Sequence, residues 1–552
     1  MVKKEFRNKL FKILSIMKMI IFIIVAIFAI FISGKKSDIT ILGEILALVY
    51  LSNLSVRKFP KITYAISSIL TLLILVNIGS LIFAGNYISY QMLNNINNFS
   101  ALGNAIPVYL TASVLAIIVS FLPIYSKKLN KNIEQNKKII VTSIVWFFIL
   151  IFYSANLNTP VKAYINTAKD FAIIKNQERK IAQENAQKRD EIIEKFTKNS
   201  MNGNIDINTE DMNLIVIFTE GLSEAVLDSN DKYADLTPNL LKFQKESYNF
   251  KNYYNHTAAT YKGIRGQLFS SVQLIESYEK NGDLSKITKT PLTGLPQILK
   301  NQDYSTSFIN PEPKHKDFAP YIKTLGFEDY PELDVTEENG YKKIDSDNPY
   351  LTDEATYNLI FDEAKKKSNE NKKFFISAYT LETHAGFDTD EKYKNGENQY
   401  LNKFHNMDIQ FGNFMKKMEK SGLDKNTIIV FTTDHTSFVT PEYKNTFGIE
   451  KDDFWNTIPL IVYIPRQRNT EIDANGRNSL GLAPTILDIL NLEDVKNMFL
   501  GSSLFIKNPT EYEHIFSEGA TLLTNKNGTR EIETDKKVID DMNEFMSISL
   551  NL

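Results

Sequence analysis

Hydrophobic residues are gathered in long runs near the start of the chain, and this grouping divides the sequence into two chemical parts. Residues 1–160 are dominated by Ile, Leu, Phe and Val, whereas the remainder is polar and charged. A helix needs about 20 apolar residues to cross the hydrocarbon core of a bilayer. The apolar runs predict an α-helical transmembrane bundle of about five spans, at residues 19–33, 39–54, 62–84, 106–125 and 139–155.

Basic residues flank these apolar runs, and their positions predict which side of the membrane each end of a span faces. The clusters are Lys3, Lys4, Arg7, Lys9 and Lys12; Arg57, Lys58 and Lys61; and Lys127, Lys128, Lys131, Lys137 and Lys138, whereas the loop 85–105 has neither Lys nor Arg. Loops rich in Lys and Arg stay on the cytoplasmic side of a membrane. With five spans all three clusters fall on that side, and with four they would be divided. We therefore expect a multi-pass protein of the bacterial cytoplasmic membrane whose polar part lies outside.

The polar part begins with a helical connector. Residues 160–200 are rich in Lys, Glu, Gln and Ala and contain neither Gly nor Pro after Pro160, which favours a helix. A cleaved signal peptide would account for the first apolar run but would leave the next ones unexplained. The expected organisation is a transmembrane domain at 1–158, a juxtamembrane helical linker at 159–205 and an extracytoplasmic catalytic domain at 206–552.

Short apolar runs alternate with helical stretches after residue 211. The strand candidates are 214–218, 305–309, 373–379, 427–432, 460–464 and 514–517, and the helix candidates include 352–367, 400–420 and 483–491. This βα alternation predicts an α/β domain with an open, mostly parallel central sheet. In such a sheet, ligands bind beyond the carboxyl ends of the strands.

Composition narrows the chemistry that this domain can perform. The net charge of −2 argues against a general nucleic-acid binder, which needs a basic surface. The chain has no cysteine, which excludes disulfides, thiolate metal sites and a cysteine nucleophile.

Three strand ends carry groups that bind metals or transfer protons. Asp434 and His435 follow the run at 427–432, Glu220 follows 214–218, and Glu382 and His384 follow 373–379. A single carboxylate after a strand is often only a helix cap, but three strand ends of one sheet converge in space. Oxygen and nitrogen ligands without sulfur suit one Zn²⁺ or Mn²⁺ ion.

The segment 252–271 supplies a group that such a metal could activate. It combines the hydroxyls of Thr257 and Thr260, the cations of Lys262 and Arg265, and the backbone freedom of Gly263 and Gly266. A helix that starts near Gly263 would direct free N–H groups at an anion. A divalent cation would lower the pKa of a threonine hydroxyl and make it a nucleophile. An ordinary capped helix with a basic first turn would show the same spacing.

The segments FTEG, NYYNHTAATYKGIRGQ, LETHAGF and TTDH, in this order, resemble the lipoteichoic acid synthase-like, sulfatase-type branch of the alkaline phosphatase superfamily. The resemblance implies that Glu220, Thr260, Asp434 and His435 are metal ligands and that Thr260 is the nucleophile. It implies that His384 contacts the phosphate or protonates the leaving group, and Lys262 and Arg265 are expected to bind substrate. The alignment leaves Thr257 as an alternative nucleophile.

The function implied by the resemblance is transfer of a phosphoglycerol or phosphoethanolamine head group. A phospholipid, phosphatidylglycerol or phosphatidylethanolamine, would donate it, and a glycolipid or glycan of the cell envelope would accept it through a phosphothreonine intermediate. Phosphoethanolamine transfer to lipid A or a surface glycan is the main alternative, although classical lipid A-modifying members carry disulfides. A sulfatase needs a Cys/Ser-x-Pro-x-Arg segment, which is absent. An inactive membrane scaffold would be favoured if a metal ligand were missing, and all four are present.

Overall fold

The chain divides into two compact units. The computed structural model describes residues 2–549 apart from 35, 57, 95–105, 125–158, 185–187, 201–202, 204, 206, 208, 210, 273–289, 316–317, 332–340, 345–349, 385, 450–453, 519–520, 527–528 and 532–535. Residues 1–172 and 439–452 form the first unit, and residues 173–438 and 453–552 form the second.

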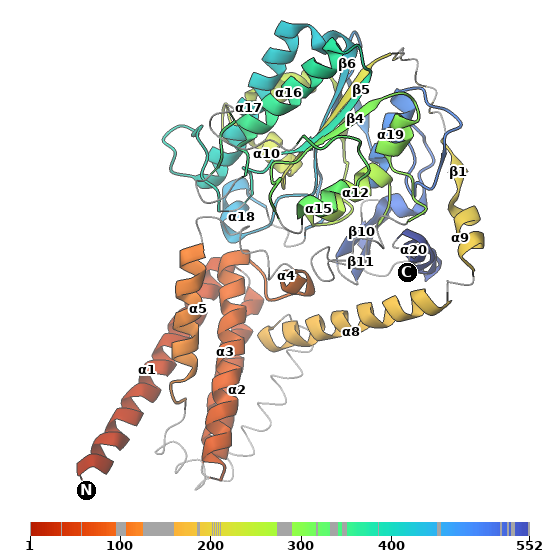
Figure 1. Cartoon of the computed structure of the whole chain (residues 1–552). Coiled ribbons are helices and arrows are strands. Elements are labelled where there is room, and N and C mark those ends of the chain that lie inside the picture. The colour runs from red at the N-terminus through yellow and green to blue at the C-terminus, as the bar shows by residue number, and fades with distance from the viewer. Residues whose placement is uncertain are drawn as a thin grey trace. The chain divides into compact units, whose positions relative to one another are not determined.

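The first unit is helical (Figure 1). Its helices are α1 (Val2–Ser33), α2 (Thr40–Ser55), α3 (Pro60–Ala84), α4 (Tyr90–Asn94), α5 (Ile106–Ser120) and the short α18 (Pro441–Phe447). Helix α3 contacts α1, α2 and α5. The buried core includes Phe22 of α1, Ile45 of α2 and Ile78 of α3. The apolar runs of the sequence therefore pack together as helices.

The expectation of about five membrane spans is not met. In the described part of the chain, two helical segments are long and apolar enough to cross a membrane, Lys9–Ser33 and Pro60–Ala84. Helices α2 and α5 have 16 and 15 residues, fewer than the roughly 20 that a span needs. Helix α5 ends where the buried Lys18 ammonium donates to the carbonyls of Ser120 (2.8 Å) and Leu122 (2.7 Å). The expected fifth span at 139–155 lies outside the described residues.

The connector forms two helices rather than one. Helix α8 covers Pro160–Glu184 and α9 covers Arg189–Phe196. The high content of Ala, Glu, Gln and Lys favours helix along both segments. Ile192 and Phe196 of α9 are buried, so this helix packs on the second unit through an apolar side.

The second unit is built on a seven-stranded sheet. Its strand order is β4 (Ser305–Ile309), β5 (Phe374–Tyr379), β2 (Asn213–Thr219), β6 (Thr427–Thr433), β7 (Leu460–Tyr463), β3 (Tyr248–Lys251) and β8 (Thr470–Asp473). The first four strands in this order are parallel. Residue pairs Ile309–Ala378, Phe218–Tyr379 and Thr219–Thr433 lie side by side near their carboxyl ends. These four strands therefore end at one edge of the sheet.

Helices cover the sheet (Figure 1). Helix α16 (Asp353–Asn369) packs on β4 and β5, and α17 (Gln399–Ser421) packs on α16 and α11 (Pro238–Lys245). A second group consists of α12 (Thr260–Phe269), α14 (Leu295–Lys300), α15 (Phe318–Lys323) and α19 (Leu482–Ile489), in which α12 contacts the other three. Every residue of β2, β5 and β6 is buried, as their unbroken apolar sequences predict for strands covered on both faces.

The sheet differs from the prediction in three places. Strand β7, within the predicted 460–464, runs antiparallel to both of its neighbours. The predicted strand 514–517 is β10 (Ile515–Glu518), which belongs to a separate antiparallel sheet with β11 (Thr521–Lys526) and β12 (Thr529–Glu531). Strands β3 and β8 were not predicted, because their short sequences YNFK and TEID carry no apolar run. The sheet is thus mixed but mostly parallel.

Helix α12 lies very close to the end of β6. It begins at Thr260, three residues before the expected start near Gly263. A Cβ atom at Gly263 would lie 2.1 Å from the carbonyl oxygen of Asp434, and one at Gly266 would lie 2.0 Å from Nε2 of His256. The side chain of Gln267 fixes the approach by donating to the carbonyl of Thr433 (2.8 Å). The glycines therefore make room for the protein's own residues.

We expect Gly263→Ala to destabilise the second unit by ~3 kcal/mol or more, since the new methyl group meets backbone that has to move. Gly422→Ala is the matched control: this residue has φ +77° and open space around it, so its cost is conformational only, about 1 kcal/mol. Thermal unfolding of the full chain in detergent measures both. Equal losses of stability would contradict the close approach of α12.

Candidate metal centre

Two carboxylates and one imidazole meet at the carboxyl ends of β2 and β6. Glu220, Asp434 and His435 each offer a ligand atom, and these atoms lie within 4.8 Å of one another. Nε2 of His435 lies 3.5 Å from Oε1 of Glu220 and 3.4 Å from Oδ2 of Asp434. All three side chains are buried. Because β2 and β6 are paired up to Thr219 and Thr433, the residues that follow them are brought together.

The carboxylate of Asp434 is held in one orientation. Its Oδ1 atom accepts hydrogen bonds from the backbone N–H groups of Gly221 (2.9 Å) and His435 (2.7 Å). The hydroxyl of Thr433 lies 3.2 Å from the same oxygen and donates to the closer carbonyl of Thr219 (2.5 Å). The Oδ2 atom of Asp434 is buried and has no hydrogen-bond partner among the described residues. Buried polar atoms are rarely left without a partner. An oxygen oriented in this way is suited to a cation.

The ring of His435 is also oriented so that one of its nitrogens could bind a cation. Its Nδ1 atom lies 2.7 Å from the carbonyl oxygen of Thr436, which can only accept, so Nδ1 carries the proton. Nε2 then has a free lone pair directed at the two carboxylates. A histidine that binds a metal commonly donates its other N–H group to a carbonyl in this way.

The electrostatics of the cluster also favour a cation. Burial, and next the charge of Asp434, raise the pKa of Glu220 well above its usual range, while a hydrogen bond from Thr260 lowers it. Two carboxylates in a buried space disfavour each other's ionisation. A divalent cation would reverse this effect and hold both groups ionised. The residues present therefore fit a metal ion.

Thr260 lies at the cluster and Thr257 does not. The Thr260 hydroxyl donates to Oε2 of Glu220 (3.1 Å) and lies 3.5 Å from Nε2 of His435. The Thr257 hydroxyl donates instead to the carbonyl of Ser517 in β10 (3.3 Å), and the side chain is buried there. Thr260 is the first residue of α12, and Ala259 before it offers no side-chain cap. The start of this helix carries the positive end of the helix dipole, which suits an anion.

The two predicted substrate-binding cations contact aromatic rings of their own helix. Arg265 is buried, and its guanidinium lies 4.2 Å from the centre of the Phe269 ring. Lys262 is half-buried, with Nζ 5.8 Å from the centre of the Tyr261 ring. Contact of these cations with a substrate stays a prediction.

The loop after β5 joins the cluster through Thr383, whose hydroxyl donates to the carbonyl of Glu220 (2.5 Å). His384 next to it is half-buried; its carbonyl accepts from Lys403 (2.6 Å) and its ring lies 5.9 Å from that of Phe387. A role of His384 at the phosphate stays a prediction.

Glu382, two residues earlier, has a structural role. Its Oε2 atom accepts from the backbone N–H of Asp353 (2.7 Å) and from the side chain of Asn406 (3.1 Å). Burial and the charge of Asp353 raise the pKa of Glu382 to about 8. This carboxyl therefore ties the loop after β5 to helices α16 and α17.

Three hydroxyls connect the loop after β2, which carries Glu220, with the loop after β6, which carries Asp434 and His435. We call Ser223, Thr436 and Ser437 the hydroxyl clasp; all three are buried. The Ser437 hydroxyl donates to the carbonyl of Gly221 (2.6 Å) and accepts from the N–H of Ser223 (3.2 Å). The hydroxyls of Ser223 and Thr436 lie 2.6 Å apart. The clasp fixes the separation between Glu220 and the Asp434–His435 pair.

Sequence reasoning missed Glu312, which follows β4 at the same edge of the sheet. Its carboxyl accepts a hydrogen bond from the hydroxyl of Tyr379, the last residue of β5. Burial raises the pKa of Glu312 to about 7. The rule that identified Glu220, an acidic residue just beyond a buried strand, could also have found Glu312.

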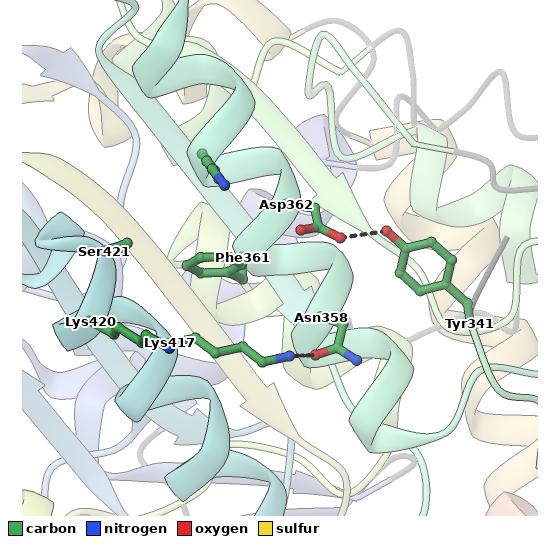
Figure 2. Close-up of a pocket in the computed structure, with 8 residues that line it drawn as sticks. Tyr341, Asn358, Phe361, Asp362, Lys417, Lys420 and Ser421 are labelled. Carbon is green, nitrogen blue, oxygen red and sulfur yellow. Dashed lines mark hydrogen bonds between the residues drawn. The ribbon is translucent and has the colours of Figure 1, made fainter.

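A surface pocket of about 500 Å³ lies elsewhere, between α16 and α17 (Figure 2). It is lined by Tyr341, Asn358, Phe361, Asp362, Lys365, Lys417, Lys420 and Ser421. Within it, Tyr341 donates to Asp362 (2.8 Å) and Lys417 contacts Asn358. It contains none of the metal-binding groups and is not part of the candidate site.

Comparison with known proteins identifies relatives that match about half of the chain. Phosphoglycerol transferase I of Escherichia fergusonii is 28% identical over 302 residues, which cover 50% of this chain and 37% of that protein. Phosphoglycerol transferase I of Salmonella choleraesuis is 27% identical over 316 residues, which cover 53% of this chain and 40% of that protein. The chain thus spans about two fifths of the length of these relatives.

Two solved structures are similar at low sequence identity. A protein in the alkaline phosphatase superfamily from Vibrio parahaemolyticus has a TM-score of 0.49 and 20% identity, covering 64% of this chain and 90% of that one. The lipoteichoic acid synthase LtaP from Listeria monocytogenes has a TM-score of 0.47 and 16% identity, covering 66% of this chain and 97% of that one.

A family match covers the candidate site itself. The family described as Sulfatase matches residues 212–492, about half of the chain. The match confirms the expectation of a sulfatase-type protein, and the matched region contains Glu220, Thr260, Asp434 and His435. The chain belongs to the sulfatase family.

Proposed function

We propose that the chain is a membrane-anchored, metal-dependent phosphotransferase. It moves a phosphoglycerol, or phosphoethanolamine, head group from a phospholipid to an acceptor in the cell envelope. The observation that carries the proposal is the Thr260 hydroxyl, which lies 3.1 Å from Glu220 and 3.5 Å from His435 at the start of α12. The phosphoglycerol transferases among the relatives support the choice of head group.

Glu220, Asp434, His435 and Thr260 would hold one divalent ion, Mn²⁺ or Zn²⁺. When bound, the ion would lower the pKa of a nearby hydroxyl and neutralise phosphate charge. The chain itself supplies the rest of the site. Its clasp fixes the separation of the ligands, and the positive end of the α12 dipole would stabilise the charge of the phosphate.

The proposed reaction has two steps. In the first, Oγ1 of Thr260 loses its proton to solvent and bonds to phosphorus, while the bond from phosphorus to the diacylglycerol oxygen breaks. That oxygen takes up a proton, which we assign to His384. In the second step, an acceptor hydroxyl gives its proton to His384 and bonds to phosphorus, and the bond to Thr260 breaks. As that bond breaks, Oγ1 of Thr260 takes up a proton from solvent, so the head group is on the acceptor and the threonine hydroxyl is restored.

The proposed location is the bacterial cytoplasmic membrane, with the catalytic domain at 206–552 outside and the linker at 159–205 between it and the transmembrane domain at 1–158. The two helical segments of spanning length support an anchored protein. Phosphoethanolamine transfer to lipid A or a surface glycan would use the same nucleophile and metal ligands. The donor assay below therefore includes both lipids.

We expect Thr260→Ala to lower release of diacylglycerol by ~10³-fold or more, because the alcohol that attacks phosphorus is removed. Incubation of the wild-type chain with labelled phosphatidylglycerol or phosphatidylethanolamine, followed by mass analysis, should show the head group on the Thr260 peptide. Thr257→Ala is the matched control and should retain activity. Activity in Thr260→Ala, or an adduct on Thr257, would contradict the assignment.

We expect Ser437→Ala to lower the affinity for Mn²⁺ by about tenfold or more, because groups that orient metal ligands have effects of this size. Calorimetric titration of the purified chain with MnCl₂ measures it. Ser503→Ala is the control: this hydroxyl is equally buried and bonded, to Asp488, but it lies outside the cluster. If both variants bind Mn²⁺ like the wild type, the clasp does not set the metal site.

A further inference from the structure

The surface pocket between α16 and α17 has the size of a ligand site (Figure 2). Its volume of about 500 Å³ falls in the range of small-molecule pockets, roughly 300–1,000 Å³. The two helices form its walls, and Tyr341 is contributed by the segment before α16. We call this recess the lysine pocket, because Lys365, Lys417 and Lys420 line it.

The lysine pocket lies away from the metal cluster. Helix α16 begins at Asp353, whose N–H donates to Glu382 in the loop after β5 (2.7 Å), at the edge of the sheet that carries the cluster. Lys365 lies about 12 residues, or ~18 Å, further along α16. Helix α17 likewise runs from the contact of Asn406 with Glu382 (3.1 Å) to Ser421 at the pocket. The pocket therefore lies toward the amino ends of the strands.

Positive charge is the first feature of the pocket's chemistry. Lys365, Lys417 and Lys420 line it together with one carboxylate, Asp362. Lys417 donates to the side-chain oxygen of Asn358, and neither of the other two lysines forms an ion pair among the residues that the structure describes. Ammonium groups that line one recess repel each other, and a bound anion removes this repulsion. Since lysine binds phosphate as a compact point charge, the pocket is suited to a phosphate group.

Compensation of the helix dipole accounts for only one of these lysines. A cation in the last turn of a helix interacts favourably with the negative end of the dipole. Lys420 lies in the last turn of α17, whereas Lys365 and Lys417 precede the last turns of α16 and α17. The dipole therefore does not explain why these two lysines share a recess with the third. A shared anion does explain it.

The rest of the lining provides a ring face and a hydrogen-bond acceptor. Phe361 is half-buried in the wall, and in Figure 2 its ring lies between the lysines of α17 and the pair formed by Tyr341 and Asp362. An aromatic ring offers an apolar face on which the C–H face of a sugar can pack. One oxygen of Asp362 accepts from the Tyr341 hydroxyl (2.8 Å), which leaves the other oxygen to accept from a ligand hydroxyl.

We propose that the lysine pocket binds a hexose phosphate, with the phosphate at the lysines, the sugar ring on Phe361 and a hydroxyl at Asp362. A dianionic phosphate monoester matches the charge of the lining, in which three lysines stand against one aspartate. The pocket contains no residue of the metal cluster. Binding at this site is therefore separate from the phosphotransfer reaction and does not depend on it.

Calorimetric titration of the full chain in detergent tests the proposal. EDTA is present so that the metal cluster holds no ion, and the pH is 8, where a phosphate monoester is dianionic. We expect glucose 6-phosphate to bind about tenfold more tightly than inorganic phosphate, which lacks the ring and the hydroxyls, because a hydrogen bond to a charged group has an effect of this size. Glucose 6-sulfate has the same ring and a single negative charge, and it should bind more weakly than glucose 6-phosphate.

Two variants and one control locate the binding. Lys420→Gln should raise the Kd for glucose 6-phosphate by about fivefold, the effect of one exposed charge pair. Lys416→Gln is the matched control: it removes an exposed lysine of the same helix that does not line the pocket, and it should leave the Kd unchanged. Phe361→Leu keeps an apolar side chain without the ring and should reduce the preference for glucose 6-phosphate over inorganic phosphate.

Three results would overturn the proposal. The first is an equal change of Kd in Lys420→Gln and Lys416→Gln, which would indicate a general attraction of charge to the surface. The second is equal affinity of the wild-type chain for inorganic phosphate and glucose 6-phosphate, which would leave the ring and the carboxylate without a role. The third is a wild-type chain that binds neither compound.

Discussion

The parallel pairing of β2 with β6 is the constraint on which the rest of the site depends. Because Thr219 and Thr433 are the last paired residues, Glu220 on one strand and Asp434 on the other emerge side by side. Two buried carboxylates this close together disfavour each other's ionisation. Ionising both of them without a cation would therefore destabilise the folded protein. Two backbone N–H groups bind one oxygen of Asp434, and the other oxygen has no hydrogen-bond partner among the described residues and is suited to a cation.

The meeting of Glu220, Asp434 and His435 could be predicted because three simple rules coincided. Unbroken apolar sequences mark strands covered on both faces, the ends of parallel strands share an edge, and ligand groups follow those ends. The choice between Thr257 and Thr260 could not be made in the same way, since both lie in an irregular segment before α12. Strand β10 holds Thr257 as a partner of Ser517, which favours Thr260 as the candidate nucleophile. That contact joins residues 260 positions apart and has no local signal.

The glycines and the membrane helices show how far sequence patterns reach. Gly263 and Gly266 permit a close backbone approach, as expected from their lack of side chains, and the groups that approach are the backbone of Asp434 and the ring of His256. The hydrophobic runs in the described part of the chain predicted helices correctly, but α5, expected at 106–125, ends at Ser120, where Lys18 binds the carbonyls of Ser120 and Leu122. Strands β3 and β8 lack apolar sequence and are formed by pairing with partners that are themselves distant in the chain.

The hydrogen bonds at one Asp434 oxygen also limit how this residue could bind a cation. With Oδ1 held by the N–H groups of Gly221 and His435, Asp434 would offer a cation one oxygen, and His435 would offer one nitrogen. Any further ligand atoms would have to come from Glu220, from Thr260 or from oxygens of a reactant.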